Sequence, residues 1–190
     1  MEKKDLKPAG VFKYFEEICQ VPRPSKKEEK MIAYLKAFGA KHNLETKVDE
    51  AGNVLIKKPA TPGKENLQTV VLQSHIDMVC EKNNDVQHDF LTDPIETEID
   101  GEWLKAKGTT LGADNGIGVA TELAILADDS IEHGPLECLF TVDEETGLTG
   151  AFALKEGFMS GDILLNLDSE DEGEIFIGCA GGIDSVAEFT

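Results

Sequence analysis

The first sixty residues combine two helical patterns with a hairpin pattern. Apolar residues recur at helical spacing over 11–20, so a helix is expected there. Ser25 and Glu28 have the spacing of a capping box, which predicts a second helix over 26–42. Two short strand-like runs within 44–59 flank the sequence "EAGN", a pattern typical of a β-hairpin.

The rest of the chain alternates runs that are apolar throughout with helical patterns. Strands are predicted at "TVVLQS", "LECLFTV", "DILLNL" and "GEIFIGCA", with a shorter strand in "GEWLKAKGTTLG" and another in "GGIDSVAEFT". Helices are expected over 115–129 and 148–157. Because the strands are apolar on both faces and alternate with helices, they indicate an α/β fold: a mixed, mostly parallel sheet with helices on both faces.

Composition narrows the class of protein. The 190 residues suffice for one substantial domain, and an apolar content of 41% supports a packed core. The 37 acidic residues outnumber the 18 basic ones and give a net charge of -19, which argues against nucleic acid and against a membrane surface as partners. The N-terminus lacks the apolar stretch of a signal peptide, and the dispersed cysteines suggest no disulfide framework. A cytoplasmic location is therefore expected.

Acidic residues and one histidine follow three of the predicted strands at their carboxyl ends. They are His75 and Asp77, Asp143 to Glu145, and Asp168, while Asp114 stands at a helix start. Ligands of open α/β sheets bind beyond these strand ends, where the carboxylates would repel one another unless a cation neutralised them. A histidine with carboxylates suits zinc or a similar ion. Each feature alone also fits a solvated loop or, for Asp114, a helix cap.

Four segments resemble the motifs of a known family, in the family's order. "SHIDMV", "GTTLGADNGIGVA", "FTVDEETGLTGA" and "LLNLDSEDEGEIFIGCAGG" are similar to the M20 metallopeptidase family, most closely to its aminoacyl-histidine dipeptidases, the carnosinase-like Xaa-His dipeptidases. The resemblance covers nearly the whole chain. It implies a zinc-peptidase-like catalytic domain that hydrolyses a small peptide substrate.

The resemblance also implies how metal ions would be bound. Two zinc ions are expected in the full-length enzyme, with cobalt or manganese as alternatives. Asp114 would bridge them. His75 and Asp168 would bind one ion, and Glu145 would bind the other.

Two further roles and one peptide bond complete the implied site. Asp77 would hold the His75 ring through its other N–H. Glu144 would be the general base that takes a proton from the attacking water and passes it to the leaving amine. The peptide bond between Asp114 and Asn115 is expected to be cis, which is rare outside proline.

A second metal-binding histidine that the family needs has no candidate here. The remaining histidines, His42, His88 and His133, lie in loops or at a helix end. We therefore expect residues 1–180 to be the N-terminal portion of a metallopeptidase catalytic domain. Residues 181–190 would begin the connection to an absent lid domain, and the isolated chain would hydrolyse little or nothing.

Other interpretations remain open at this stage. Because the lid contributes much of the substrate recognition in this family, the resemblance also admits a tripeptidase or an acylase. A non-catalytic metal-binding module is the alternative from a different class. Members of the family often dimerise through the lid, which leaves a homodimer open for the full-length protein.

Overall fold

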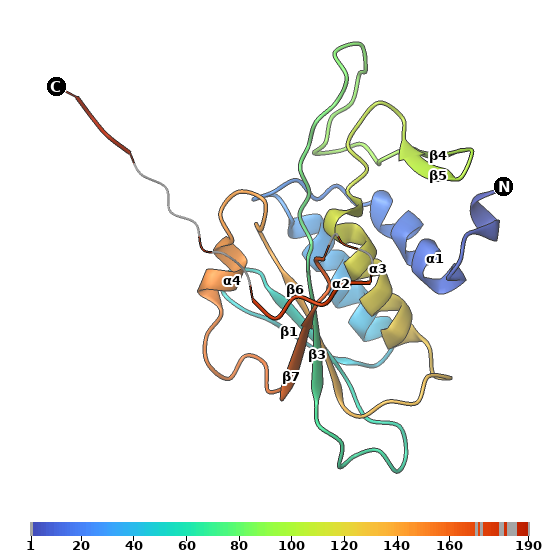
Figure 1. The fold of residues 1–190 in the computed structure, drawn as a ribbon, viewed down its shortest axis with the longest axis vertical. Helices are drawn as coiled ribbons and strands as arrows, with labels where there is room; N and C mark the ends of the chain where they lie inside the picture. Colours follow the sequence, from blue (N-terminus) through green and yellow to red (C-terminus); the bar gives the residue numbers. More distant parts are fainter. Residues whose placement is uncertain (1, 170, 172, 179–180, 182–185, 190) are drawn as a thin grey trace.

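A five-stranded sheet with the strand order β1-β2-β6-β3-β7 forms the centre of the protein (Figure 1). The computed structural model describes residues 2–169, 171, 173–178, 181 and 186–189. The strands of the sheet are β1 (Glu45–Val48), β2 (Val54–Lys58), β3 (Val70–His75), β6 (Leu136–Thr141) and β7 (Ile163–Asn166). β2 pairs antiparallel with β1 and β6, whereas β6, β3 and β7 pair in parallel. Only β2 is reversed, which confirms the predicted mixed, mostly parallel sheet.

One face of the sheet is covered by the three long helices. They are α1 (Ala9–Cys19), α2 (Glu29–Lys41) and α3 (Ala113–Ala127). Successive strand residues point to opposite faces, and one set, which includes Ile56, Leu72 and Phe140, packs with the apolar sides of these helices in a single core. All three helices are predicted by the sequence, and so is the β1–β2 hairpin.

The opposite face is covered more thinly. Its buried residues Leu55, Val71 and Leu139 pack against side chains of the loop that follows α4 (Thr149–Ala153), namely Leu154, Phe158 and Met159. Figure 1 shows α4 and α1 on opposite sides of the sheet. The predicted helix over 148–157 is therefore shorter in the structure, because the residues after Ala153 leave the helix and turn onto the sheet.

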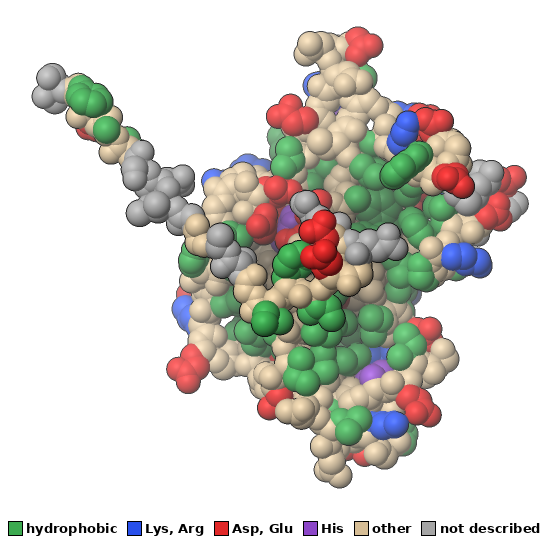
Figure 2. Space-filling model, viewed as in Figure 1, with side chains coloured by type: hydrophobic (Ala, Val, Ile, Leu, Met, Phe, Trp, Pro, Cys, Tyr) green, Lys and Arg blue, Asp and Glu red, His purple; other side chains and the backbone are tan. Residues whose placement is uncertain are grey.

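β7 is less buried than its apolar sequence predicts. Ile163, Leu164 and Leu165 are 40%, 48% and 49% exposed, and Figure 2 shows hydrophobic side chains at the surface in this part of the molecule. Among the described residues β7 pairs with β3 alone, at the edge of the sheet. The expectation that each apolar strand is covered on both faces is wrong here.

The other differences lie in connecting segments. The described residues 173–178 of "GEIFIGCA" contain no strand, and 179–180 lie outside the described residues. In "GGIDSVAEFT" the described residues 181 and 186–189 contain no strand either, and the others are again outside. The sequence prediction missed a short 3-10 helix, Lys3–Asp5, and β4 (Thr97–Asp100), which pairs with the expected strand β5 (Trp103–Ala106) in a separate two-stranded sheet.

The sequence predicts no disulfide framework and no membrane-spanning helix. Cys19, Cys80 and Cys138 are free thiols, and Cys179 lies outside the described residues. No helix in the described part of the chain has the length and apolar character needed to cross a membrane.

A carboxylic acid lies inside the core between α3 and β3. Glu122 of α3 is fully buried, and its carboxyl group accepts a 2.6 Å hydrogen bond from the Ser74 hydroxyl. Burial raises the pKa of Glu122 well above its usual range, more than the hydrogen bonds from Ser74 and Cys138 lower it. In the native protein Glu122 is therefore protonated at a pH where the unfolded chain has ionised it.

The substitution Glu122→Gln is expected to increase the free energy of unfolding, and to do so more at high pH. An acid whose native pKa is raised costs stability above its unfolded pKa, because only the unfolded state gains by releasing the proton. Glutamine keeps the acceptor for Ser74 and removes this cost. The gain should grow by about 1.4 kcal/mol per pH unit above pH 5 until the native pKa is reached. Urea unfolding at pH 5 and pH 7 measures it, and an equal gain at both would contradict the prediction.

Candidate metal centre

The carboxyl ends of three parallel strands meet at one edge of the sheet. His75 ends β3 and pairs with Thr141 at the end of β6, and the chain continues from Thr141 into the acidic run. On the other side of β3, Gln73 pairs with Asn166 of β7. Asp168 follows Asn166 by two residues. The register of the sheet, which the sequence does not specify, therefore brings the predicted strand-end residues together.

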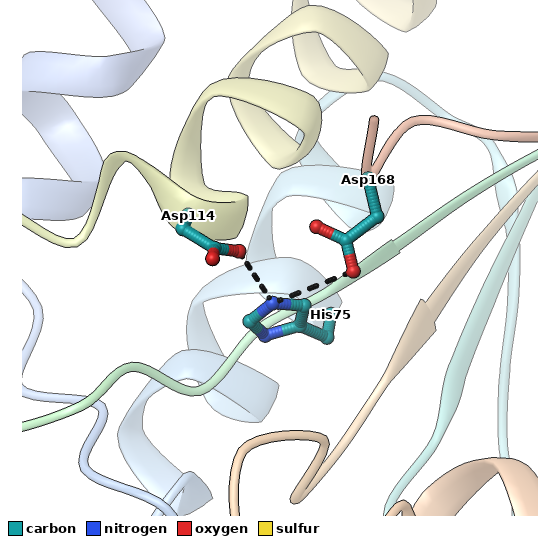
Figure 3. A group of neighbouring side chains, drawn as sticks. All are labelled: His75, Asp114 and Asp168. Atoms are coloured by element: carbon teal, nitrogen blue, oxygen red, sulfur yellow. Dashed lines mark hydrogen bonds and ion pairs between the residues drawn. The ribbon is translucent and has the colours of Figure 1, made fainter. Parts of the chain in front are cut away.

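His75, Asp114 and Asp168 form the first group of potential metal ligands (Figure 3). The Nε2 atom of His75 lies 3.0 Å from Asp114 Oδ1 and 3.8 Å from Asp168 Oδ2. His75 is buried, with 1% of its surface exposed, whereas Asp114 is largely exposed. Each residue offers a ligand atom within 4.8 Å of the others. A single divalent ion could contact all three.

His75 also belongs to a second group, with Glu144 and Glu145. Their ligand atoms again lie within 4.8 Å of one another. Both glutamates come from the segment that leaves β6, and both are partly buried. The structure thus places the other four predicted ligand and base residues around the imidazole ring of His75, and the five come from four separate parts of the chain. The histidines His42, His88 and His133 belong to none of the groups of potential ligands in the described residues.

Asp77 is completely buried and contacts the ring from behind. Its Oδ1 lies 3.1 Å from His75 Nδ1 and accepts the backbone N–H of Glu144 at 3.0 Å. Its Oδ2 accepts the Ser25 hydroxyl at 2.7 Å and the Glu145 N–H at 3.2 Å. A proton held on Nδ1 by Asp77 leaves the lone pair of Nε2 for a cation on the side of Asp114. The geometry is the one expected for an orienting carboxylate.

The predicted capping box of α2 is wrong, because both of its residues have other partners. Glu28 is itself the N-cap residue of α2 and makes no capping hydrogen bond with its side chain. Ser25 donates its hydroxyl to Asp77 instead. Glu28 accepts the backbone N–H groups of Lys26 and Asp143. Tertiary contacts to the candidate metal centre therefore replace the local contact that the spacing predicts.

The electrostatics of the group indicate crowded negative charge. Burial opposes the charged form of His75, but hydrogen bonds to Asp77 and Asp114 and the charge of Asp168 outweigh it and raise the pKa of His75 to about 9. Burial raises the pKa of Asp168 to about 6, where the charge of His75 lowers it and that of Asp114 raises it. Burial and the charge of Asp114 also raise the pKa of Glu145. A bound cation would stabilise the ionised carboxylates at this edge.

Asp77 shows the opposite shift. Burial alone would raise its pKa, but the hydrogen bonds from His75, Glu144 and Ser25 outweigh burial and lower the pKa of Asp77 to about 2. Asp77 is therefore a permanent carboxylate at physiological pH, as a group that orients the histidine needs to be.

Arg23 is a part of the site that the sequence analysis did not single out. Its buried guanidinium donates to the carbonyl oxygens of Ile76 and Asp77, both at 2.9 Å, and to that of Gly112 at 2.5 Å. It thereby ties the segment after His75 to the loop before Asp114. A Cβ atom at Gly112 would lie 2.6 Å from Arg23 Nη2, so the loop needs glycine there. Arg23 is the only arginine in the sequence, and that was the available signal.

The start of α3 delivers Asp114 to the site. Asp114 and Asn115 have non-helical backbone angles, and the peptide bond between them is cis, which confirms the expectation. The Asn115 side chain then accepts the N–H of Gly118 at 3.1 Å, and regular helix follows. Asp114 therefore precedes the helix proper and does not act as its cap.

Comparisons with known proteins find relatives over most of this chain. A family model described as Peptidase family M20/M25/M40 matches residues 71–186. The cytosol non-specific dipeptidase of Escherichia coli (strain K12) is 54% identical over 183 residues, which are 96% of this chain and 38% of that protein. The match spans all the candidate site residues.

Solved structures extend the comparison. The aminoacylhistidine dipeptidase from Vibrio alginolyticus has a TM-score of 0.91 and 56% identity, over 94% of this chain and 36% of that one. The aminopeptidase PepT from Bacillus cereus has a TM-score of 0.72 and 26% identity, over 85% of this chain and 43% of that one. The chain spans less than two fifths of the length of the first two relatives.

The substitution Arg23→Lys is expected to destabilise the protein by roughly 2–3 kcal/mol. Lysine keeps the charge, but its single ammonium group cannot reach the three carbonyl oxygens that the planar guanidinium bridges. Urea unfolding of the metal-free protein measures the loss. The matched control is Lys27→Arg, the reverse substitution at an exposed position nearby. It should change the free energy of unfolding little. An unchanged unfolding midpoint for Arg23→Lys would refute the prediction.

Proposed function

Because the chain belongs to the peptidase family M20/M25/M40, we propose that it supplies the metal centre of a dipeptidase that cleaves its substrate with a metal-activated water. The observation that carries the proposal is the convergence of His75, Asp114, Asp168, Glu144 and Glu145 at one sheet edge. One imidazole with four carboxylates can hold divalent metal ions, and metal-assisted hydrolysis uses ions held by such ligands.

The donor set fits zinc. Zinc accepts both imidazole nitrogen and carboxylate oxygen as ligands, and cobalt and manganese are alternatives with the same donors. Asp114 would be a ligand shared by two ions, His75 and Asp168 would help to hold one of them, and Glu145 would help to hold the other. The group of His75, Asp114 and Asp168 supports the first of these ligand sets, and Glu145 lies beside it in the group of His75, Glu144 and Glu145.

The other residues would handle protons and geometry. When bound, the zinc ions lower the pKa of water and polarise the peptide carbonyl. Glu144 takes the proton from that water and passes it to the leaving amine, since it lies beside the ligands. Asp77 keeps the His75 ring in one orientation and anchors the backbone of Glu144. Adjacent side chains diverge along an extended segment, so one glutamate can bind metal while its neighbour faces the water.

The substrate class is proposed from the relatives. The Vibrio protein is named an aminoacylhistidine dipeptidase and the Escherichia coli protein a cytosol non-specific dipeptidase. We propose an Xaa-His dipeptide as substrate and the cytosol as the place of action. A tripeptidase or acylase specificity remains the alternative, because this chain spans only part of its relatives. The division of the chain near residue 180 and a homodimer stay predictions.

Glu144→Gln is expected to lower kcat for an Xaa-His dipeptide by roughly 10²–10⁴-fold, the usual contribution of a general base. Zinc content should be unchanged because Glu144 is not a proposed ligand. Activity is measured on the full gene product and zinc by atomic absorption. Glu156→Gln, at an exposed position, is the matched control. Full activity of Glu144→Gln would exclude the proposed base. If the unsubstituted protein also hydrolysed no dipeptide, the result would favour a non-catalytic metal-binding module.

Zinc affinity is expected to rise about tenfold per pH unit between pH 6 and pH 9. The pKa of His75 is about 9 in the metal-free protein, so one proton must leave before Nε2 can bind zinc. Below pH 6 the rise should be steeper because Asp168, with a pKa of about 6, must also lose a proton. Competition with a chelator of known affinity measures this slope. The matched control His133→Gln should keep it, and a slope near zero in the unsubstituted protein would contradict the assignment of His75.

A further inference from the structure

The segment that carries Glu144 and Glu145 is attached to the rest of the protein by its backbone amides. Each of the N–H groups of residues 142–145 donates to a side-chain oxygen. We propose that Glu28, through the N–H of Asp143, is a positioning residue that sets where Glu144 and Glu145 point. The inference rests on the proposed function of those two glutamates.

Three side chains from separate parts of the fold make these contacts. Asn53, just before β2, accepts the N–H of Val142 at 3.1 Å. Glu28, at the start of α2, accepts the N–H of Asp143 at 3.0 Å. The two oxygens of Asp77 accept the next two N–H groups along the chain. A run of four amides is thus held entirely by side chains.

The backbone conformation explains why side chains are needed. β6 ends at Thr141, and Asp143 has a φ of 50°, in the left-handed region that non-glycine residues seldom adopt. The amides that follow the strand therefore have no strand partner, yet Val142 and Asp143 are buried. Buried N–H groups require acceptors, so a loop with this shape depends on Glu28 and Asn53.

Glu28 is well suited to fix a position. Only 6% of its surface is exposed, and the Oε1 atom that binds Asp143 also accepts the N–H of Lys26 at 2.9 Å. The carboxyl group therefore connects the loop directly to the turn that begins α2. Because α2 is packed in the main core, this contact fixes the loop to a rigid element of the fold.

The far side of the loop is equally constrained. The carboxylate of Asp143 accepts the hydroxyl groups of Thr146 and Thr149. Asn53 also donates to the carbonyl oxygen of Gly150 at 2.8 Å, and a Cβ atom at Gly150 would lie 2.4 Å from the carbonyl oxygen of Val142. The loop is thus confined between α4 and the start of α2, and Glu28 is the contact on the α2 side.

The carboxylates of Glu28, Asp77 and Asp143 come within 4.8 Å of one another. Each of them is already bound by N–H or O–H donors. We therefore assign these acids to holding the loop. Their effect on the reaction would be exerted through the direction of Glu144 and Glu145, where a displacement of about 1 Å can cost on the order of a hundredfold in rate.

The first experiment measures backbone amide exchange of Asp143 by NMR in the 190-residue protein, without activity. Glu28→Met keeps the length of the side chain and removes the acceptor, so exchange of the Asp143 N–H should become at least tenfold faster. Glu28→Gln keeps an acceptor oxygen and should restore protection to within a few-fold of the original. Glu29→Gln, at an exposed neighbouring position on the same helix, is the matched control. Retained protection of the Asp143 N–H in folded Glu28→Met would overturn the proposal.

The second experiment separates kcat from KM in the full gene product. Glu28→Met should lower kcat by roughly ten- to a hundredfold with KM and zinc content nearly unchanged, whereas Glu28→Gln should recover most of kcat. Equal kcat values for the two variants would overturn the proposal. If Glu28→Met does not fold, Glu28→Gln decides: a folded protein with an unprotected Asp143 N–H overturns the proposal, and a protected one with nearly full kcat supports it.

Failure of the proposed function would look different. If Glu144→Gln in the same protein were fully active, the assignment of the base would be wrong, while the amide exchange result for Glu28 would stand. If Glu144→Gln were inactive but Glu28→Met had unchanged kcat and Asp143 exchange, the positioning role alone would be wrong.

Discussion

The buried carboxylate of Asp77 is the interaction on which the rest of the site depends. It receives the His75 ring, the Ser25 hydroxyl and the amides of Glu144 and Glu145, so one side chain joins β3, the turn before α2 and the end of β6. A buried charge is stable only when it is well hydrogen-bonded, and these four contacts supply that. The same contacts set the direction of Nε2 and of both glutamates.

The charged groups around Asp77 lie on two sides of it, one buried and one open. Arg23 lies on the buried side and contacts only carbonyl oxygens, so its positive charge remains available to the acids around it. On the open side the acids face one another, and burial together with the charge of Asp114 raises the pKa values of Asp168 and Glu145. A cation bound there would reduce the repulsion between the carboxylates. The same carboxylates would also be its ligands.

Local pattern predicted most of the fold, and it failed where a distant contact competes with a local one. The spacing of Ser25 and Glu28 fits a capping box, but both side chains bind the metal-centre segments instead. The helix expected over 148–157 ends early because the apolar side chains that follow it pack onto the sheet. β7 reads as a buried strand, but its place at the edge of the sheet leaves it exposed. In the first two cases a contact with another part of the chain outweighs the local preference, and in the third the order of the strands leaves an apolar strand uncovered.

The sequence by itself determined most of the helices and strands, the mixed α/β class, the acidic strand ends and the family resemblance, because periodicity and short motifs are properties of neighbouring residues. Only the tertiary structure decided which acids lie around the His75 ring and which hold the backbone. Asp77 and Asp143 both stand in acidic strand-end motifs, yet Asp77 contacts the histidine and Asp143 the threonines of its own loop. The contacts that Arg23, Glu28 and Asn53 make at the site could not be predicted from the sequence, because these partners lie 53 to 115 residues away along the chain and no local spacing encodes such contacts.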